Sequence, residues 1–252
     1  MCVTTAPSWF PHALPGTPRP SPLRVRFFCI PHGGAGGSVF RPWQHLLGPG
    51  TEVVPVQLPG REIRMTEPAE TSVVRLAEKL AAPLTRRAEG LPYVLFGHSM
   101  GALLAYELAL ALQDSGRPPA ALVVSGSVPP HLPRSTPAMH PLPDREFVAG
   151  LRRLGGIPPE LLADEEWLAL VLPQLRADFE AAETYRAHGV LRPGIPLIAL
   201  GGSDDPAAAP AEVERWRDLG TDVRVRVFAG DHFFVFAAAP QVLAFVAKEL
   251  AW

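Results

Sequence analysis

The pentapeptide Gly97-His98-Ser99-Met100-Gly101 has the pattern G-x-S-x-G and constrains the fold more than any other part of the chain. It follows an apolar run at 93–96 and precedes a helix-like stretch that begins at residue 102. A serine in this setting occupies a sharp, strained turn, and the two glycines leave the backbone room to close. The pattern therefore predicts a strand–turn–helix unit that presents the Ser99 hydroxyl to a ligand.

Apolar runs of strand length alternate with helical patterns along the chain, which is typical of a mostly parallel sheet with helices on both faces. The runs span 25–30, 53–57, 93–96, 121–125, 197–200 and 223–228, and the helices are expected at 72–88, 102–113 and 240–250. A chain of 252 residues has the length of a single α/β domain, so we expect residues 1–252 to form one. Its first part, 1–22, is rich in proline and is expected to be a loose leader.

The alternation stops between residues 129 and 194. Six prolines between residues 129 and 143 oppose regular structure, after which Asp144 is the expected cap of a helix that ends at Gly155-Gly156. A second helical pattern follows, and Pro173 is expected to kink it. An insertion between two strands would lie above the carboxyl edge of the sheet, where ligands bind in such folds. We interpret 129–194 as a lid insertion, with completion of the core as the alternative for its apolar faces.

The composition excludes several classes of protein. Hydrophobic residues make up 47% of the chain and charged residues 19%, and the net charge of −2 leaves no basic excess for binding nucleic acid. The only cysteines are Cys2 and Cys29, and the second lies in an apolar run, so no disulfide scaffold is expected. The chain has neither the pattern of a signal peptide nor an apolar run of membrane-spanning length. We therefore expect a cytoplasmic protein that binds no membrane, and a monomer.

A serine nucleophile needs a base within hydrogen-bonding reach and a carboxylate that orients this base. In α/β-hydrolases these residues follow the serine in the order acid, then histidine. His232 comes directly after the run 223–228 and is the only histidine that follows a strand downstream of an acidic loop. His98 is the neighbour of Ser99 but is expected to point away, because side chains diverge across the turn. His232 is therefore the candidate base.

The acidic loop contains two candidates for the carboxylate, Asp204 and Asp205, directly after the run 197–200. Asp205 is favoured because it completes a G-x-x-D spacing from Gly202 and because Pro206 stiffens the backbone behind it. Asp204 stays open as the alternative. The candidate catalytic residues are thus Ser99, Asp205 and His232.

Acyl transfer places negative charge on the former carbonyl oxygen, which backbone N–H groups must stabilise. One donor is expected at Met100, the residue after the nucleophile, and the second in the loop after the run 25–30. That loop contains Gly33-Gly34-Ala35-Gly36-Gly37, and Gly33 is the candidate. A phosphate-binding loop is excluded, because the last glycine of G-x-G-x-x-G and any G-K-[ST] are missing.

In combination and in this order, the chain's motifs resemble the type II thioesterases of polyketide and nonribosomal-peptide assembly lines, a branch of the α/β-hydrolases. The segments that carry the resemblance are 28–34 (FCIPHGG), 40–43 (FRPW), 57–61 (QLPGR), 96–101 (FGHSMG), 154–158 (LGGIP) and 230–234 (GDHFF). The chain departs from the family at Gly33, where many members have alanine, and at Pro206-Ala207-Ala208, which is less bulky than usual. The first departure leaves a backbone donor unchanged, whereas the second keeps the choice between Asp204 and Asp205 open.

The resemblance implies a triad of Ser99, Asp205 and His232, amide donors at Gly33 and Met100, and a mobile helical lid over an acyl chamber. It also implies the removal of short or aberrant acyl groups from the phosphopantetheine arm of an acyl or peptidyl carrier protein. The arm belongs to the partner, so no cofactor and no metal of the chain's own is expected. Four arginines of the insertion are hypothetical docking charges for an acidic carrier, with a solvated helix face as the alternative: Arg134, Arg152, Arg153 and Arg176.

Two rival functions remain from the sequence. The first is a general carboxylesterase or lipase that acts on small esters, since it would use the same residues. The second is a module that keeps the fold and docks a carrier protein without catalysis, which the presence of all three triad residues opposes.

Overall fold

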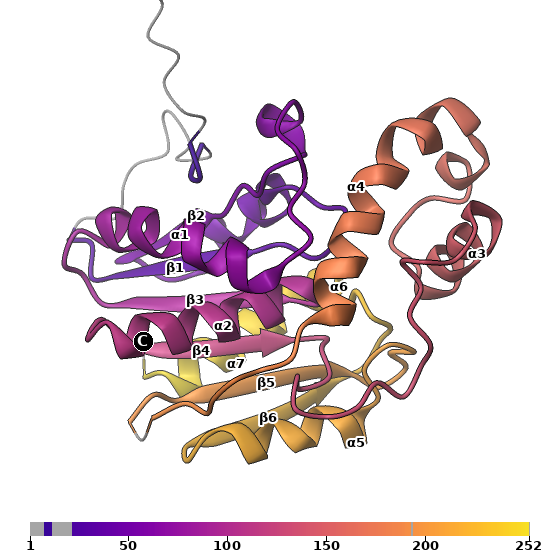
Figure 1. Ribbon diagram of the computed structural model, residues 1–252. Helices are drawn as coiled ribbons and strands as arrows, with labels where there is room; N and C mark the ends of the chain where they lie inside the picture. Colours follow the sequence, from indigo (N-terminus) through magenta and orange to yellow (C-terminus); the bar gives the residue numbers. More distant parts are fainter. Residues whose placement is uncertain (1–7, 12–21, 193, 252) are drawn as a thin grey trace, which may run out of the picture.

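The computed structural model describes residues 8–11, 22–192 and 194–251 (Figure 1). Cys2, His12 and most of the expected leader lie outside the described residues. Residues 8–11 belong to that leader and contact the rest of the chain. The Trp9 carbonyl accepts a hydrogen bond from the Gln57 N–H at 2.8 Å, and the ring of Phe10 lies 5.6 Å from that of Phe28.

Six parallel strands form one sheet in the order β2-β1-β3-β4-β5-β6 (Figure 1). Their bounds are β1 Val25–Ile30, β2 Thr51–Pro55, β3 Tyr93–His98, β4 Ala121–Ser125, β5 Leu197–Gly202 and β6 Val223–Phe228. The predicted α/β-hydrolase class, a mostly parallel sheet with helices on both faces, is confirmed. The strand predicted at 53–57 is shifted, because Thr51 already pairs with Val25 while Gln57 uses its N–H to bind Trp9.

Helices cover both faces of the sheet. On one face lie α1 (Val73–Ala88) and α2 (Met100–Asp114), together with α5 (Pro210–Val213) and the 3₁₀ segment η4 (Glu214–Leu219). On the other lie the 3₁₀ segment η1 (Gly37–His45), α6 (Phe234–Ala237) and α7 (Ala239–Glu249). Strands β1 to β5 are buried on both sides, and β3, β4 and β5 are largely apolar. The edge strand β6 is only partly buried and alternates valine with arginine. Within the described residues, none of the helices has both the length and the hydropathy needed to cross a bilayer.

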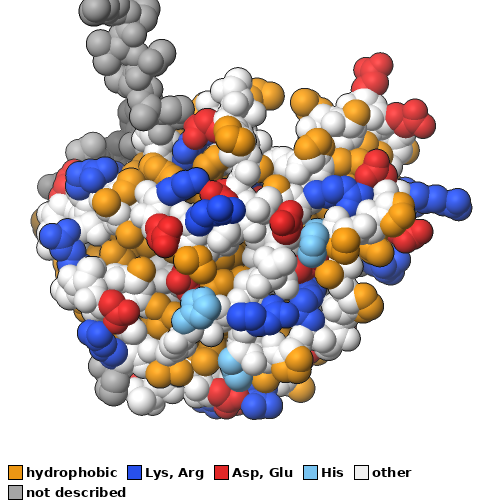
Figure 2. Space-filling model, in the orientation of Figure 1, with side chains coloured by type: hydrophobic (Ala, Val, Ile, Leu, Met, Phe, Trp, Pro, Cys, Tyr) orange, Lys and Arg blue, Asp and Glu red, His pale blue; other side chains and the backbone are white. Residues whose placement is uncertain are grey.

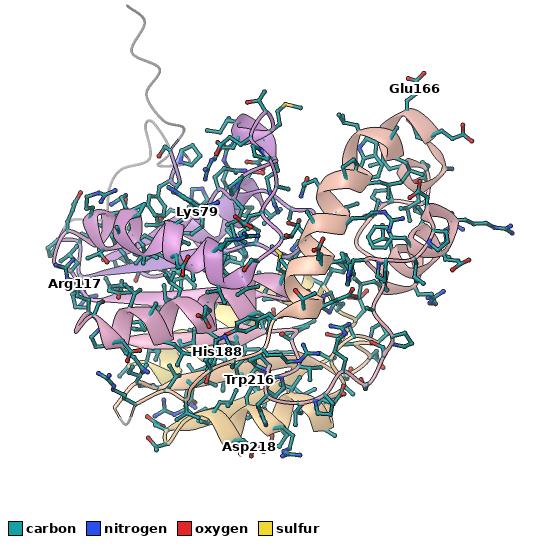
Figure 3. All side chains as sticks on the ribbon, in the orientation of Figure 1. Lys79, Arg117, Glu166, His188, Trp216 and Asp218 are labelled. Atoms are coloured by element: carbon teal, nitrogen blue, oxygen red, sulfur yellow. The ribbon has the colours of Figure 1, made fainter. Side chains whose placement is uncertain are left out.

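Between β4 and β5 the chain forms a helical insertion that contains α3 (Asp144–Leu154), η3 (Leu161–Ala163) and α4 (Glu165–Thr184). Its outer part has an apolar cluster of its own, formed by Phe147, Leu151, Leu162, Leu172 and Leu175. Figures 1 and 3 show α4 running from the tip of the insertion, marked by Glu166, down to the carboxyl ends of the strands.

One local prediction in the insertion is wrong. Asp144 is the first residue of α3 and not its cap, because Pro143 takes the extended cap conformation. At N1 a proline or an acidic residue is favoured, and the Asp144 carboxylate stabilises the positive end of the helix there. The helix ends where expected, since Gly155 and Gly156 both have positive φ values, 84° and 81°.

Strand pairing aligns the carboxyl ends of the strands at one edge. Ile30 pairs with Gly97, His98 with Ser125, and Gly202 with Phe228. The segments that follow β1, β3, β5 and β6 therefore leave the sheet side by side. These are the segments in which the sequence placed its candidate residues.

Candidate active site

Ser99 occupies the tight turn between β3 and α2 with φ 55° and ψ −120°, a conformation that is rare for a residue with a side chain. Both flanking glycines are required by close backbone contacts. A Cβ at Gly97 would lie 1.9 Å from the Gly101 carbonyl oxygen, and a Cβ at Gly101 would lie 2.3 Å from that of Ile30. The turn is held against the sheet, because the Ser99 N–H donates to the Ser125 carbonyl at 2.8 Å.

Asp205 and His232 form a buried pair, with Asp205 Oδ2 at 2.8 Å from His232 Nδ1. The other carboxylate oxygen, Oδ1, accepts the N–H groups of Ala207 at 2.8 Å and Ala208 at 3.2 Å. These two bonds fix the plane of the carboxylate and aim Oδ2 at the imidazole. Asp204 is exposed and its carboxylate binds the hydroxyl of Ser203 instead, so of the two candidates only Asp205 contacts the histidine.

Ser99 and His232 line the same cavity, which has a volume of about 560 Å³. Its wall is contributed by the turn at Ser99, by the start of α2, by the loop after β4 and by both helices of the insertion. Apolar side chains make up most of the lining from the insertion, including Met139, Leu142, Leu154 and Phe179. The cavity therefore offers a mostly apolar chamber next to the candidate nucleophile Ser99 and the candidate base His232.

The candidate amide donors lie next to this turn. Gly33 follows β1, and the carbonyls of Ile30 and Pro31 approach Gly101 closely, so the loop after β1 adjoins the start of α2. Met100 is the first residue of α2, where the helix dipole favours a negative charge. Among the described residues, the N–H groups of Gly33 and Met100 have no acceptor, whereas the N–H of Gly34 is bound by Asp178.

The sequence did not indicate that two further histidines would lie beside His232. The ring of His98 lies 5.0 Å from that of His232 and 5.7 Å from that of His32, and its Nδ1 contacts the Ser125 hydroxyl at 3.1 Å. Burial lowers the pKa of His98 well below its ordinary value, and a positive charge on His232 or His32 would lower it further. Burial, with repulsion from His232 and Arg61, lowers the pKa of His32 to about 3. Both rings are therefore neutral neighbours of the candidate base.

The other described histidines, His45, His131, His140 and His188, are not among the residues that line the cavity. His45 and His188 are exposed, and Figure 3 shows His188 beside α2 on the segment that leads to β5. His131 binds Asp218 at 3.1 Å, and His140 binds Glu183 at 2.6 Å. In the described parts of the chain, no group of three or more histidine, cysteine, aspartate or glutamate residues is arranged to hold a metal ion.

The four arginines of the insertion do not form one basic surface. Arg176 binds Asp144 and the His140 carbonyl at 2.6 Å each, and Arg134 lies 3.4 Å from Glu183, so both have partners inside the insertion. On the face in Figure 2, the Lys and Arg side chains over the insertion alternate with acidic ones. Arg152 and Arg153 are exposed and remain the candidates for contact with an acidic partner.

Two buried carboxylates were also missed by the sequence reasoning. Asp178 and Glu183 lie on α4, and each accepts backbone N–H groups from a loop distant in the sequence, Asp178 from Gly34 and Glu183 from Met139 and His140. The available signal was a charged residue at a helical position that periodicity assigns to the buried face. Such a residue is expected to bind a specific partner, although periodicity does not name it.

Comparisons with known proteins identify the family of this chain. A family model described as a thioesterase domain matches residues 25–250. The gramicidin S biosynthesis protein GrsT of Aneurinibacillus migulanus is similar, with 36% identity over 232 residues that cover 91% of this chain and 90% of GrsT.

Two solved structures are also similar. RedJ, a thioesterase from the prodiginine biosynthetic pathway of Streptomyces coelicolor, superposes with a TM-score of 0.84 and 40% identity over 96% of this chain and 92% of its own. YbtT, a type II thioesterase from the yersiniabactin pathway of mixed nonribosomal-peptide and polyketide synthesis, superposes with a TM-score of 0.83 and 32% identity over 93% of this chain and 96% of its own.

Proposed function

We propose that this chain, which belongs to the thioesterase family and is a type II thioesterase of polyketide and nonribosomal-peptide biosynthesis, removes acyl groups from the phosphopantetheine arm of a carrier protein. The observation that carries the proposal is the buried Asp205–His232 pair, whose histidine lines the same cavity as Ser99. A nucleophile, a base and an apolar chamber together are the parts that acyl transfer requires.

In the proposed reaction, His232 takes the proton of the Ser99 hydroxyl as its oxygen attacks the thioester carbonyl. Asp205 holds the imidazole with the proton on Nδ1, so that Nε2 is free to accept. The tetrahedral intermediate collapses with loss of the pantetheine thiol, which takes the proton from His232. A water molecule, deprotonated by the same histidine, then attacks the acyl-enzyme and releases the carboxylic acid and Ser99.

The N–H groups of Gly33 and Met100 are the proposed donors to the oxygen that becomes negative in each step. Their lack of an acceptor among the described residues supports this role, as does the position of Met100 at the start of α2. The reaction needs no metal and no cofactor of the chain's own, because the thiol arm is covalently attached to the partner.

We propose that the substrates are short or aberrant acyl groups that would otherwise block the assembly line. A chamber of about 560 Å³ with a mostly apolar lining has room for an acyl group. The helical insertion forms much of the wall, which supports its proposed role as a lid. Arg152 and Arg153 are proposed contacts for the acidic surface of an acyl or peptidyl carrier.

The decisive experiment compares turnover of acyl groups on a carrier protein with turnover of the matching p-nitrophenyl esters. We expect kcat/KM to be far higher for the carrier thioesters; the reverse order would identify a general carboxylesterase. Ser99→Ala is expected to abolish turnover without loss of folding. Labelling of Ser99 by a fluorophosphonate probe separates an enzyme from a docking module, since a module that only binds carriers would not react.

A further inference from the structure

A buried carboxylate joins three segments that are far apart in the sequence. Asp178 of α4 binds Arg61 through both oxygens, with Oδ1 at 2.7 Å from Nη2 and Oδ2 at 2.9 Å from Nη1. Oδ2 also accepts the Gly34 N–H at 2.7 Å and the side-chain amide of Gln174 at 2.9 Å. The side chains of Asp178 and Arg61 are only 1% and 5% exposed.

Helix α4 also makes close van der Waals contact with the loop at residues 33–37, which we call the glycine loop. A Cβ at Gly33 would lie 3.3 Å from Asp178 Cβ, and one at Gly34 would lie 2.5 Å from the Leu175 side chain. One face of α4 thus packs directly on the backbone of residues 33 and 34. Gly34 has a φ of 84°, so its conformation depends on external contacts more than that of an ordinary residue.

Arg61 binds the Asp178 carboxylate together with Gly34. It belongs to the segment 57–61 (QLPGR), to which the proposed chemistry gives no role. Its Nε donates to the Pro59 carbonyl at 3.1 Å, and Gln57 of the same segment accepts the Gly37 N–H at 3.1 Å. The glycine loop is therefore held at Gly34 and Gly37, in both cases through this segment or its ion-pair partner.

The contribution of the Arg61–Asp178 ion pair to folding stability is not enough to explain why it is buried. Removing two charges from water is costly, and a buried ion pair often contributes no more than apolar side chains of the same volume. The pair does, however, fix the orientation of the groups that it binds. A bidentate arginine holds the carboxylate plane, and the carboxylate then holds the Gly34 N–H, which orients the peptide group between Gly33 and Gly34. The Gly33 N–H belongs to the preceding peptide group, which shares the Gly33 Cα and is restricted further because Asp178 packs against Gly33.

We propose that Arg61 and Asp178 are a positioning pair that holds the Gly33 N–H in the geometry of an oxyanion donor, and that this geometry forms only when α4 is seated on the glycine loop. The inference rests on the proposed function, since it assigns a role to residues that act through Gly33. It explains why Gly34 gives its own N–H to Asp178. It also links the helical insertion to the reaction centre through one carboxylate.

The test uses Asp178→Asn and Arg61→Lys in the full chain. In either orientation of an asparagine, the amide N–H₂ faces an N–H of Arg61, and in one of them it also faces the Gly34 N–H. A lysine at position 61 loses the bidentate contact. The matched control is Glu52→Gln, which weakens another buried arginine pair, with Arg26 Nε at 2.8 Å, far from the glycine loop. The readouts are kcat and KM for an acyl-carrier thioester and the Ki of an acyl trifluoromethyl ketone, whose adduct with serine bears an oxyanion.

We expect kcat to fall roughly 10- to 100-fold in both variants with KM within about threefold, because a misplaced donor loses part of the effect of a deleted one. The Ki of the trifluoromethyl ketone should rise by the same factor as kcat/KM falls. Glu52→Gln should change neither quantity by more than about twofold while lowering the melting temperature. If a single variant fails to fold, the double variant Arg61→Met/Asp178→Leu replaces it, because it leaves no unpaired charge. The double variant should fold, and its kcat should remain low.

Two outcomes overturn the inference alone: an unchanged Ki in a variant with reduced kcat, or wild-type kcat in Asp178→Asn, Arg61→Lys or the double variant. Failure of the proposed function would look different. In that case the wild-type chain itself would not hydrolyse carrier-bound acyl groups, or Ser99→Ala would still do so.

Discussion

The substitution Asp205→Asn tests the proposed triad most directly, because the structure dictates how the new side chain must lie. Oδ1 of Asp205 accepts two backbone N–H groups, from Ala207 and Ala208. An asparagine must keep its only oxygen there, since an amide N–H₂ would face two donors. Its N–H₂ group then takes the place of Oδ2 and faces Nδ1 of His232, now 2.8 Å from a carboxylate oxygen.

The expected loss follows from this orientation. A donor at that position stabilises the imidazole tautomer that has its proton on Nε2, and this tautomer cannot accept the proton of Ser99. The corresponding change in a serine protease lowers kcat about 10⁴-fold. At about 1.4 kcal/mol for each factor of ten, this corresponds to about 5.5 kcal/mol of transition-state stabilisation. Because the fixed bonds to Ala207 and Ala208 survive, the fold should not change.

The assay is release of free thiol from an acyl-carrier thioester, with circular dichroism as the check on folding. Asp204→Asn is the matched control, because its carboxylate is exposed and accepts a hydrogen bond from the neighbouring Ser203 hydroxyl at 2.8 Å, not from His232. It should keep kcat within about twofold, as expected for a surface change away from the site. The assignment would be refuted by an Asp205→Asn variant within tenfold of wild type, or by an equal loss in Asp204→Asn.

Gly101→Ala should abolish labelling of Ser99 by a fluorophosphonate and lower the melting temperature, since its Cβ would lie 2.3 Å from a carbonyl oxygen. Gly48→Ala, where a Cβ meets nothing within 4 Å, should change neither, and a similar effect of both would contradict the steric argument. The lowered pKa of His98 means that the unfolded chain takes up a proton below pH ~6.5 while the native chain does not, so the free energy of unfolding should fall by up to about 1.4 kcal/mol per pH unit as the pH decreases. Urea titrations of His98→Gln should show a smaller slope, and an unchanged slope would exclude this cause. Ala182→Leu adds volume to the cavity wall and should lower kcat/KM for decanoyl more than for acetyl thioesters, by about 0.8 kcal/mol per excluded methylene. Equal losses for both chains would place the acyl group elsewhere.

The sequence predicted the sheet well because a parallel sheet covered on both faces needs apolar runs that periodicity detects directly. The runs 25–30, 121–125 and 223–228 match β1, β4 and β6 to the residue. The strand at 53–57 was misplaced because its boundary is set by the hydrogen bond between Gln57 and Trp9, two residues 48 positions apart. Local patterns do not contain that information.

In the candidate site, too, the residues in local motifs were predicted and the long-range contacts were missed. A G-x-S-x-G motif and an acid–histidine order point to Ser99, Asp205 and His232, since each follows a strand whose end lies at the same edge. The pair Arg61–Asp178 was missed, because its members are 117 residues apart and neither belongs to a local motif of known mechanism. The contact between His98 and His232 was missed for a related reason. The prediction considered only the direction away from Ser99, and not which side chains the neighbouring strands bring to the same place.

The position of the insertion follows from the order of the strands. Ser99 follows β3 and Asp205 follows β5, and β4 lies between these two strands in the sheet. A segment inserted after β4 therefore leaves the edge between Ser99 and Asp205, and can cover both without crossing another connection. Because α4 continues past this point to the loop after β1, the same helix can line the cavity at Ser99 with Phe179 and hold Gly34 with Asp178. An insertion after β2, at the margin of the sheet, would have to cross the ends of β1, β3 and β4 to reach Asp205.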